Sequence, residues 1–234
     1  MTPPPPRPIN VPPGLDLVYA DEALLVLNKP AGLLSVPGRG PENTDCLSAR
    51  AQALYPDALV VHRLDMSTSG LLVMARGAAA QRTLSRAFAD RLTNKTYLAM
   101  VAGHPTTGES GKPDWNLIDM PLIVDWPNRP RSVVDPIHGK PSQTLWRVLS
   151  LGHTPPLPCA LLELQPITGR SHQLRVHLQA LGHPILGDEL YATAEGVEAT
   201  PRLMLHASRI ALPHPTTQQT LVFESPPVGA EWAV

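Results

Sequence analysis

Charge, cysteine and long apolar runs are scarce in this chain of 234 residues. Charged residues make up 17%, below the usual share of about 25%, and the formal net charge is −1. This composition does not indicate a basic surface overall, although the field of a local cleft depends only on where its charges lie. No run of 18 apolar residues occurs, and the first residues lack the apolar stretch of a signal peptide. We therefore expect no membrane-spanning segment.

The two cysteines, Cys46 and Cys159, lie far apart within apolar stretches. This predicts buried free thiols in a reducing compartment, and hence a cytoplasmic protein. Two distant cysteines do not make a zinc site, and His172 and His177 are spaced to lie on different faces of a helix, so we expect no metal. Proline is abundant, with 28 residues, and its density near the N-terminus predicts an extended, flexible arm over residues 1–14.

The apolar pattern predicts many short strands and about three helices. Strands are expected near 15–19, 23–27, 59–61, 71–74, 95–101, 121–124, 143–151, 159–165, 202–212 and 220–224. Helices are expected after a Thr44 cap, over 80–91, and from about 172 to 181. Surface loops are expected at 103–114 and around Pro155–Pro158. Strands that follow one another as hairpins favour an α+β fold with a mixed, mainly antiparallel sheet.

Between two apolar runs lies the polar stretch from His62 to Gly70, with Asp65 near its centre. A loop held by two buried strands is a rigid place for a reactive carboxylate. The alternative is an ordinary turn in which the aspartate bonds nearby backbone N–H groups. The stretch alone is compatible with both interpretations.

Two further stretches carry groups that can bind a ligand, one an anion and the other a nucleic-acid loop. Gly169-Arg170-Ser171 comes just before a helical pattern, where free N–H groups favour an anion. Trp126-Pro127-Asn128-Arg129-Pro130 presents an aromatic ring and a guanidinium in one stiff turn, which can stack on a nucleic-acid loop or can pack as a plain turn. Glycine-rich nucleotide-binding motifs and a Gly-x-Ser-x-Gly elbow are absent from the sequence.

Several motifs taken in order resemble the RluA family of RNA pseudouridine synthases. The central one is His62-Arg63-Leu64-Asp65-x-x-Thr68-Ser69-Gly70. The others are Asn28-Lys29-Pro30-x-Gly32-Leu33, Lys95-x-Tyr97, Gly169-Arg170-x-His172-Gln173-Leu174-Arg175-x-His177, the stretch from Gly182 to Tyr191, and Leu205-His206-Ala207. The resemblance covers roughly residues 15–226. The Asp-Trp-Pro-Asn-Arg-Pro stretch is similar to the dual-specificity branch, whose members modify 23S rRNA and a tRNA anticodon stem-loop.

The resemblance implies the pseudouridine synthase catalytic fold over residues 15–234, with no S4 RNA-binding domain. It implies isomerisation of uridine to pseudouridine in structured RNA loops, those of 23S rRNA and/or a tRNA anticodon stem-loop. The reaction follows base flipping and needs no cofactor, and the protein is expected to be a monomer. Asp65 resembles the catalytic aspartate, Arg170 the arginine that pairs with it, and Tyr97 the tyrosine that stacks on the uracil. Arg63 resembles the residue that fills the space left by the flipped base, and Leu205 resembles the residue that lines the uracil's other face. Three basic residues resemble phosphate contacts: Lys29, Arg129 and Arg175. Arg175 alternatively supports its helix.

Two other functions stay open from the residues. A glycosidase or nucleosidase would use Asp65 as the nucleophile, with Asp188 as the candidate second carboxylate. A non-catalytic RNA-binding module would not need Asp65 at all. Within the synthase hypothesis, Asp65 either attacks C1′ or promotes glycal formation.

Overall fold

The computed structural model describes residues 14–106 and 115–232. Apart from Gly14, the expected proline-rich arm lies outside the described residues, as does most of the loop expected at 103–114. The chain divides into two compact units, Met1–Lys95 with Ala207–Pro226, and Thr96–His206 with Pro227–Val234.

The first unit is built on a sheet with the strand order β1-β2-β4-β11. Its strands are β1 (Asp16–Ala20), β2 (Leu24–Lys29), β4 (Ser69–Arg76) and the later part of β11 (Leu205–Pro213). Strand β3 (Ala58–Val60) pairs with β4, and β12 (Thr220–Glu224) pairs with β11. All the residues of β4 before Arg76 are buried, which explains why the strand contains a continuous apolar run.

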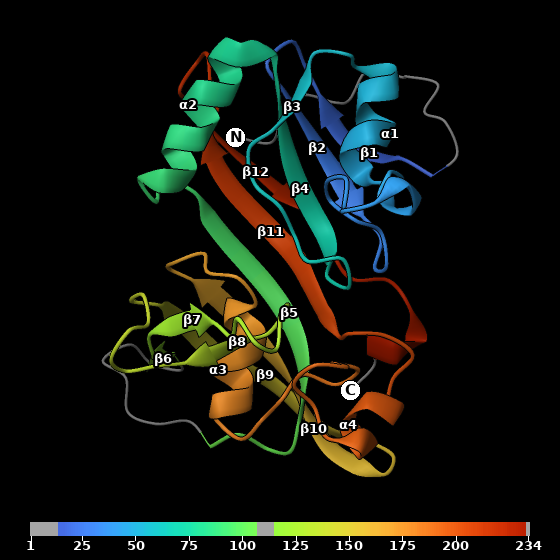
Figure 1. The fold of residues 1–234 in the computed structure, drawn as a ribbon, viewed down its shortest axis with the longest axis vertical. Helices are drawn as coiled ribbons and strands as arrows, with labels where there is room; N and C mark the ends of the chain where they lie inside the picture. The colour runs from blue at the N-terminus through green and yellow to red at the C-terminus, as the bar shows by residue number, and fades with distance from the viewer. Residues whose placement is uncertain (1–13, 107–114, 233–234) are drawn as a thin grey trace. The chain divides into compact units, whose positions relative to one another are not determined.

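Two α-helices flank this sheet: α1 (Leu47–Leu54) packs on β3, and α2 (Gly77–Ala89) packs on β3 and β4 (Figure 1). A short 3₁₀ helix, Pro41–Asn43, precedes α1. The expected Thr44 cap is wrong. The extended residue Cys46 caps α1 because its Sγ accepts from Ala49 N at 3.4 Å, whereas the Thr44 hydroxyl donates to the Pro41 carbonyl.

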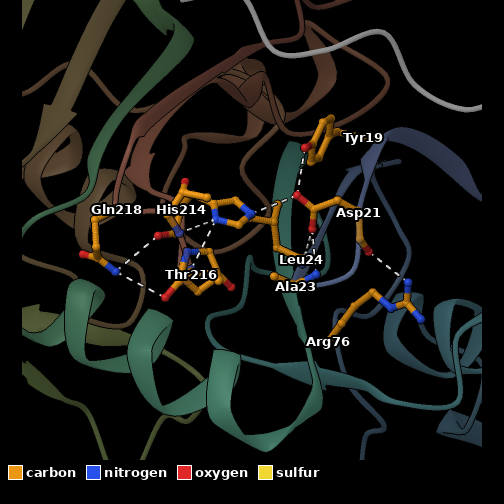
Figure 2. Close-up of polar contacts among 10 residues, drawn as sticks. Tyr19, Asp21, Ala23, Leu24, Arg76, His214, Thr216 and Gln218 are labelled. Carbon is orange, nitrogen blue, oxygen red and sulfur yellow. Dashed lines mark hydrogen bonds and ion pairs between the residues drawn. The ribbon is translucent and has the colours of Figure 1, made fainter.

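A partly buried polar cluster connects the β1–β2 turn to the turn after β11 (Figure 2). Asp21 accepts from the Tyr19 hydroxyl at 2.8 Å and from His214 Nε2 at 2.9 Å. Because His214 Nδ1 accepts two backbone N–H groups, its proton lies on Nε2. Burial and the Asp21 carboxylate raise the pKa of Tyr19 to about 12, so its hydroxyl stays protonated. The cluster therefore fixes two chain-distant turns of the first unit.

The second unit carries an antiparallel sheet in the order β5-β10-β9-β6. Its strands are β5 (Asn94–Ala102), of which residues 96–102 belong to this unit, β10 (Leu157–Pro166), β9 (Gln143–Thr154) and β6 (Asn116–Asp119). The expected loop at Pro155–Pro158 is wrong in extent. Leu157 already pairs with Thr154, so only two prolines form the turn.

A separate two-stranded hairpin, β7 (Leu122–Val124) and β8 (Ser132–Val134), also belongs to the second unit. The unit contains α3 (Gln173–Ala180), α4 (Ala194–Glu198) and the 3₁₀ turn Ala230–Trp232. The sequence pattern does not predict α4, because five residues show no clear helical period. Its start follows a Thr193 hydroxyl that accepts from Gly196 N.

Each unit has its own apolar core. Cys46 and Cys159 are buried and free, as expected. No helix in residues 14–106 and 115–232 is long and apolar enough to cross a membrane. The expected α+β fold with a mostly antiparallel mixed sheet is confirmed.

Candidate functional site

The loop that carries Asp65 is anchored immediately before the carboxylate. The Ser35 hydroxyl donates to the Leu64 carbonyl at 2.7 Å, and Leu64 N donates back to Ser35 Oγ at 3.1 Å. Both residues are buried. This reciprocal pair fixes the backbone on one side of Asp65, whose own side chain is half-buried.

Lys29 anchors the loop immediately after the carboxylate. Its ammonium donates to the carbonyls of Pro30, Leu33 and Met66 at 2.8–2.9 Å, and the side chain is only 1% exposed. Burial lowers the Lys29 pKa to about 8, and the charge of Asp65 opposes that shift. The ammonium is thus saturated by backbone carbonyls below the surface. The phosphate contact expected for Lys29 does not fit this placement, which is that of a loop-positioning group.

The ends of the loop are also held by close packing. His62 stacks on Phe88 with ring centroids 4.5 Å apart, and its Nε2 accepts from Val73 N at 2.9 Å. Burial, aided by Lys95, lowers the His62 pKa to about 3, so the ring is neutral. At the other end, Gly70 has φ 107°, and an added Cβ would lie 2.3 Å from the Ala207 carbonyl oxygen. Only glycine fits there.

Arg63 differs from its neighbours because its side chain is exposed, while Leu64 beside it is buried. The first unit therefore brings together Lys29 and the Asp65 loop, and presents Arg63 outward from the same loop.

In the second unit, Gln173 holds the segment that carries Arg170. Its Oε1 accepts from Arg170 N at 3.0 Å and from the Thr168 hydroxyl at 2.7 Å. Its Nε2 donates to the Gln143 carbonyl and to Thr144 Oγ1. Gln173 is 4% exposed, whereas the Arg170 side chain is exposed. A rigid backbone thus presents a guanidinium at the start of α3.

Arg175 lies on α3 and points into the interior. It makes two hydrogen bonds of 2.7 Å to Asp188, and the two side chains are 6% and 0% exposed. Its guanidinium also lies 5.1 Å from the centre of the Tyr191 ring. Of the two roles expected for Arg175, support of its helix fits this placement and a phosphate contact does not.

The turn from Trp126 to Pro130 projects from the hairpin β7–β8. Arg129 stacks over the Trp126 ring at 4.5 Å, and the Trp126 side chain is 65% exposed. Asn128 donates to the Asp125 carboxylate at 2.9 Å, which stiffens the turn. An exposed aromatic–guanidinium pair on a stiff turn is suited to stacking on an RNA base.

Tyr97 and Leu205 belong to the core of the second unit. Leu205 is 3% exposed, and the half-buried Tyr97 packs against the same apolar cluster. His177 is fully buried, with Thr144 on Nδ1 and the Met120 carbonyl on Nε2, and burial lowers its pKa. It is a structural hydrogen-bonding group. No cluster of three or more His, Cys, Asp or Glu suited to a metal occurs in the described part of the chain.

Comparison with known proteins assigns the family. Residues 23–180 match the RNA pseudouridylate synthase family. The chain is 48% identical over 214 residues to the dual-specificity RNA pseudouridine synthase RluA of Salmonella typhi, covering 92% of this chain and 94% of that protein. It is 52% identical over 204 residues to the protein of the same name from Vibrio parahaemolyticus, covering 87% and 79%.

The chain belongs to the RNA pseudouridylate synthase family. Its fold agrees. The structure of human RNA pseudouridylate synthase domain containing 1 matches with a TM-score of 0.74 at 31% identity, covering 94% of this chain and 86% of that one. Human RNA pseudouridylate synthase domain containing 4 matches with a TM-score of 0.69 at 28% identity, covering 90% and 88%. The motif pattern therefore predicted the family and the fold class correctly.

Within this pseudouridine synthase fold, sequence reasoning missed the residues that position the site. Ser35 lies outside every motif, so no sequence signal could have found it. Gln173 and Tyr191 occur in the family-like motifs, but nothing local shows that Gln173 reaches back to Arg170 or that Tyr191 bonds residues 59 and 19 positions away.

Proposed function

We propose that this RNA pseudouridine synthase modifies uridines in two structured RNAs, a 23S rRNA loop and a tRNA anticodon stem-loop. Support comes from the identity of 48% and 52% to synthases named as dual-specificity. The observation that carries the proposal is the Asp65 loop, held by Ser35 before the carboxylate and by Lys29 after it. Such a loop suits a reaction that needs one carboxylate at a fixed position.

The chemistry is an isomerisation. The N1–C1′ bond of uridine breaks, the uracil turns, and C5 bonds to C1′. The proton on C5 leaves and a proton is gained at N1, so the atoms balance and no electrons are exchanged. In this proposal Asp65 either attacks C1′ as a nucleophile, or promotes a glycal by removing the C2′ proton, which is returned when C5 bonds to C1′.

Arg170 and Tyr97 complete the proposed catalytic set, on the basis of the motifs that they occupy. A guanidinium can orient a carboxylate and stabilise its charge where water is excluded. A tyrosine can stack on the uracil and assist removal of the C5 proton. The Arg170 backbone is held by Gln173, which suits a positioned cation.

The target base has to leave its stack before Asp65 can reach C1′. We assign the exposed Arg63 to the space left by the flipped base, and Leu205 to the uracil's other face. Arg129, stacked on Trp126, is assigned to contact with the RNA outside the reacting nucleotide. Lys29 and Arg175 are assigned to positioning, since both are buried and fully engaged.

The glycosidase alternative is disfavoured by the state of Asp188. The Asp188 side chain is fully buried and bound by Arg175, so it is not available as a general acid. We also propose that the protein is a monomer and acts in the cytoplasm. Sedimentation of the purified protein would test its oligomeric state.

The test uses 23S rRNA and a tRNA anticodon stem-loop labelled with tritium at uridine C5. Each is incubated with wild type, with Asp65→Asn, and with Asp90→Asn, an exposed aspartate at the end of α2. Wild type and Asp90→Asn are expected to release tritium to water from both RNAs, and Asp65→Asn from neither. Release from one RNA alone would refute dual specificity. Release by Asp65→Asn at the wild-type rate would refute the role of Asp65.

A further inference from the structure

The hydroxyl of Tyr191 joins two segments of the second unit that are far apart in sequence. It accepts from Ser132 N at 2.8 Å, and it lies 2.8 Å from His172 Nδ1. The side chain is 4% exposed, and burial raises its pKa, so the hydroxyl keeps its proton. Because Ser132 N can only donate, the hydroxyl hydrogen is available to donate to His172 Nδ1. We expect this arrangement, in which the imidazole carries its proton on Nε2.

The segment that contains His172 also carries Arg170. His172 lies two residues later and caps α3 in the left-handed conformation, with φ 54°. A residue other than glycine costs free energy in that conformation unless contacts hold it. Tyr191 supplies those contacts, through the hydrogen bond and an edge-on ring contact with centroids 5.6 Å apart. The backbone that presents Arg170 is therefore braced by Gln173 on one side and by Tyr191 through His172 on the other.

The second segment is the start of β8, directly after the exposed Trp126–Pro130 turn. Ser132 is 2% exposed, so its N–H would lose its partner below the surface if the hydroxyl were removed. The Arg131 guanidinium also lies 5.3 Å from the centre of the Tyr191 ring. Tyr191 therefore holds the base of the turn that carries the stacked Trp126 and Arg129.

Tyr191 is itself fixed from behind. Asp188 accepts from Tyr191 N at 3.2 Å, and the same carboxylate forms the buried pair with Arg175, whose guanidinium lies against the Tyr191 ring. These contacts hold the Tyr191 backbone and one side of its ring, while the hydroxyl contacts Ser132 and His172.

We propose that Tyr191 is a positioning residue that couples the Arg170 segment to the Trp126–Arg129 turn, so that catalysis and RNA contact depend on one hydroxyl. The inference rests on the proposed function, because it gives both segments a role toward RNA. It predicts that the two roles fail together when the hydroxyl is removed.

Tyr191→Phe keeps the ring and its contacts with the two arginines. Tyr19→Phe is the matched control, since that buried hydroxyl donates to Asp21 in the first unit. Tyr191→Phe is expected to lower kcat about fivefold to thirtyfold, the range that one misplaced hydrogen-bonded group spans, and to raise the Kd for RNA. Tyr19→Phe is expected to change neither.

Two double-mutant cycles separate positioning from general loss of structure. In the first, Tyr191→Phe is combined with His172→Asn, because asparagine tolerates the left-handed conformation but is too short to reach the hydroxyl. In the second, it is combined with Arg129→Ala. The proposal expects non-additive effects on kcat in the first and on Kd in the second. Additive effects in either cycle would overturn it.

The imidazole ¹⁵N shifts of His172 give a readout that does not depend on activity. Wild type is expected to show the proton on Nε2, and Tyr191→Phe a mixture of tautomers. An unchanged tautomer in the variant would overturn the inference. An inactive wild type would refute the proposed function instead, and would be seen before any variant is compared.

Discussion

Replacement of Lys29 by methionine tests how the Asp65 loop is held. Methionine fills much of the same volume but leaves the carbonyls of Pro30, Leu33 and Met66 without their donor. The Leu33 carbonyl, whose bond to Lys29 is buried, then has no replacement from solvent, and the Pro30 and Met66 carbonyls lose their donor at partly buried positions. The Met66 carbonyl follows Asp65 directly, so the carboxylate is expected to lose its fixed position.

The magnitude follows from two opposing effects. A hydrogen bond from a charged donor contributes about 1.5–3 kcal/mol, and three are lost. Burial of the ammonium opposes this, because lowering its pKa from 10.5 to about 8 corresponds to about 3 kcal/mol. The hydrogen bonds outweigh the desolvation, and Lys29→Met is expected to lower the free energy of unfolding by about 2–5 kcal/mol.

The assay is urea unfolding at pH 7, together with kcat for tritium release from the folded variant. Lys140→Met, at an exposed lysine, is the matched control and is expected to leave both unchanged. A reduced kcat in the folded Lys29→Met protein would support the positioning role. Unchanged unfolding and unchanged kcat would refute the reasoning. An unchanged free energy of unfolding together with a raised Kd for RNA would instead support a phosphate contact by Lys29.

Three further changes test single contacts. Asp188→Asn leaves Arg175 buried and unpaired, so urea unfolding should show a loss of about 3–5 kcal/mol, and a loss under 1 kcal/mol would contradict the buried pair. Gly70→Ala should lower the free energy of unfolding by more than about 3 kcal/mol, because the added Cβ would meet backbone atoms of Ala207. Gly32→Ala, where the added Cβ meets nothing within 4 Å, should lower it by about 1 kcal/mol. Equal losses would disprove the close approach at Gly70. The His62 pKa is lowered to about 3 in the folded protein, so between pH 3 and 6.5 the unfolded chain binds more protons than the folded one. Relative to His62→Gln, the free energy of unfolding of wild type should therefore fall by about 3 kcal/mol from pH 6.5 to 4. Parallel curves of unfolding free energy against pH for the two proteins would contradict this.

The sequence predicts those parts of the site that depend on local pattern. The loop around Asp65 lies between apolar runs that form β3 and β4, because strand propensity and burial act over a few neighbouring residues. The helix after Arg170 is visible for the same reason. The family motifs then identify which loops matter.

The sequence does not predict how these loops are fixed. Lysine and arginine are rarely buried, so Lys29 and Arg175 are expected at the surface, where a phosphate is the natural partner. Their partners include the Met66 carbonyl, 37 residues from Lys29, and Asp188, 13 residues from Arg175, which only the tertiary fold brings near. Ser35 and Tyr191 act over similar separations. No periodicity records such contacts.

The central claim is that the chain isomerises uridine in RNA and releases nothing but the C5 proton. Its most direct test is digestion of treated RNA to nucleosides, followed by chromatographic separation of uridine, pseudouridine and free uracil. The account predicts that wild type converts uridine to an equal amount of pseudouridine with no free uracil, and that Asp65→Asn converts none. Free uracil in place of pseudouridine would establish a glycosidase and contradict the account.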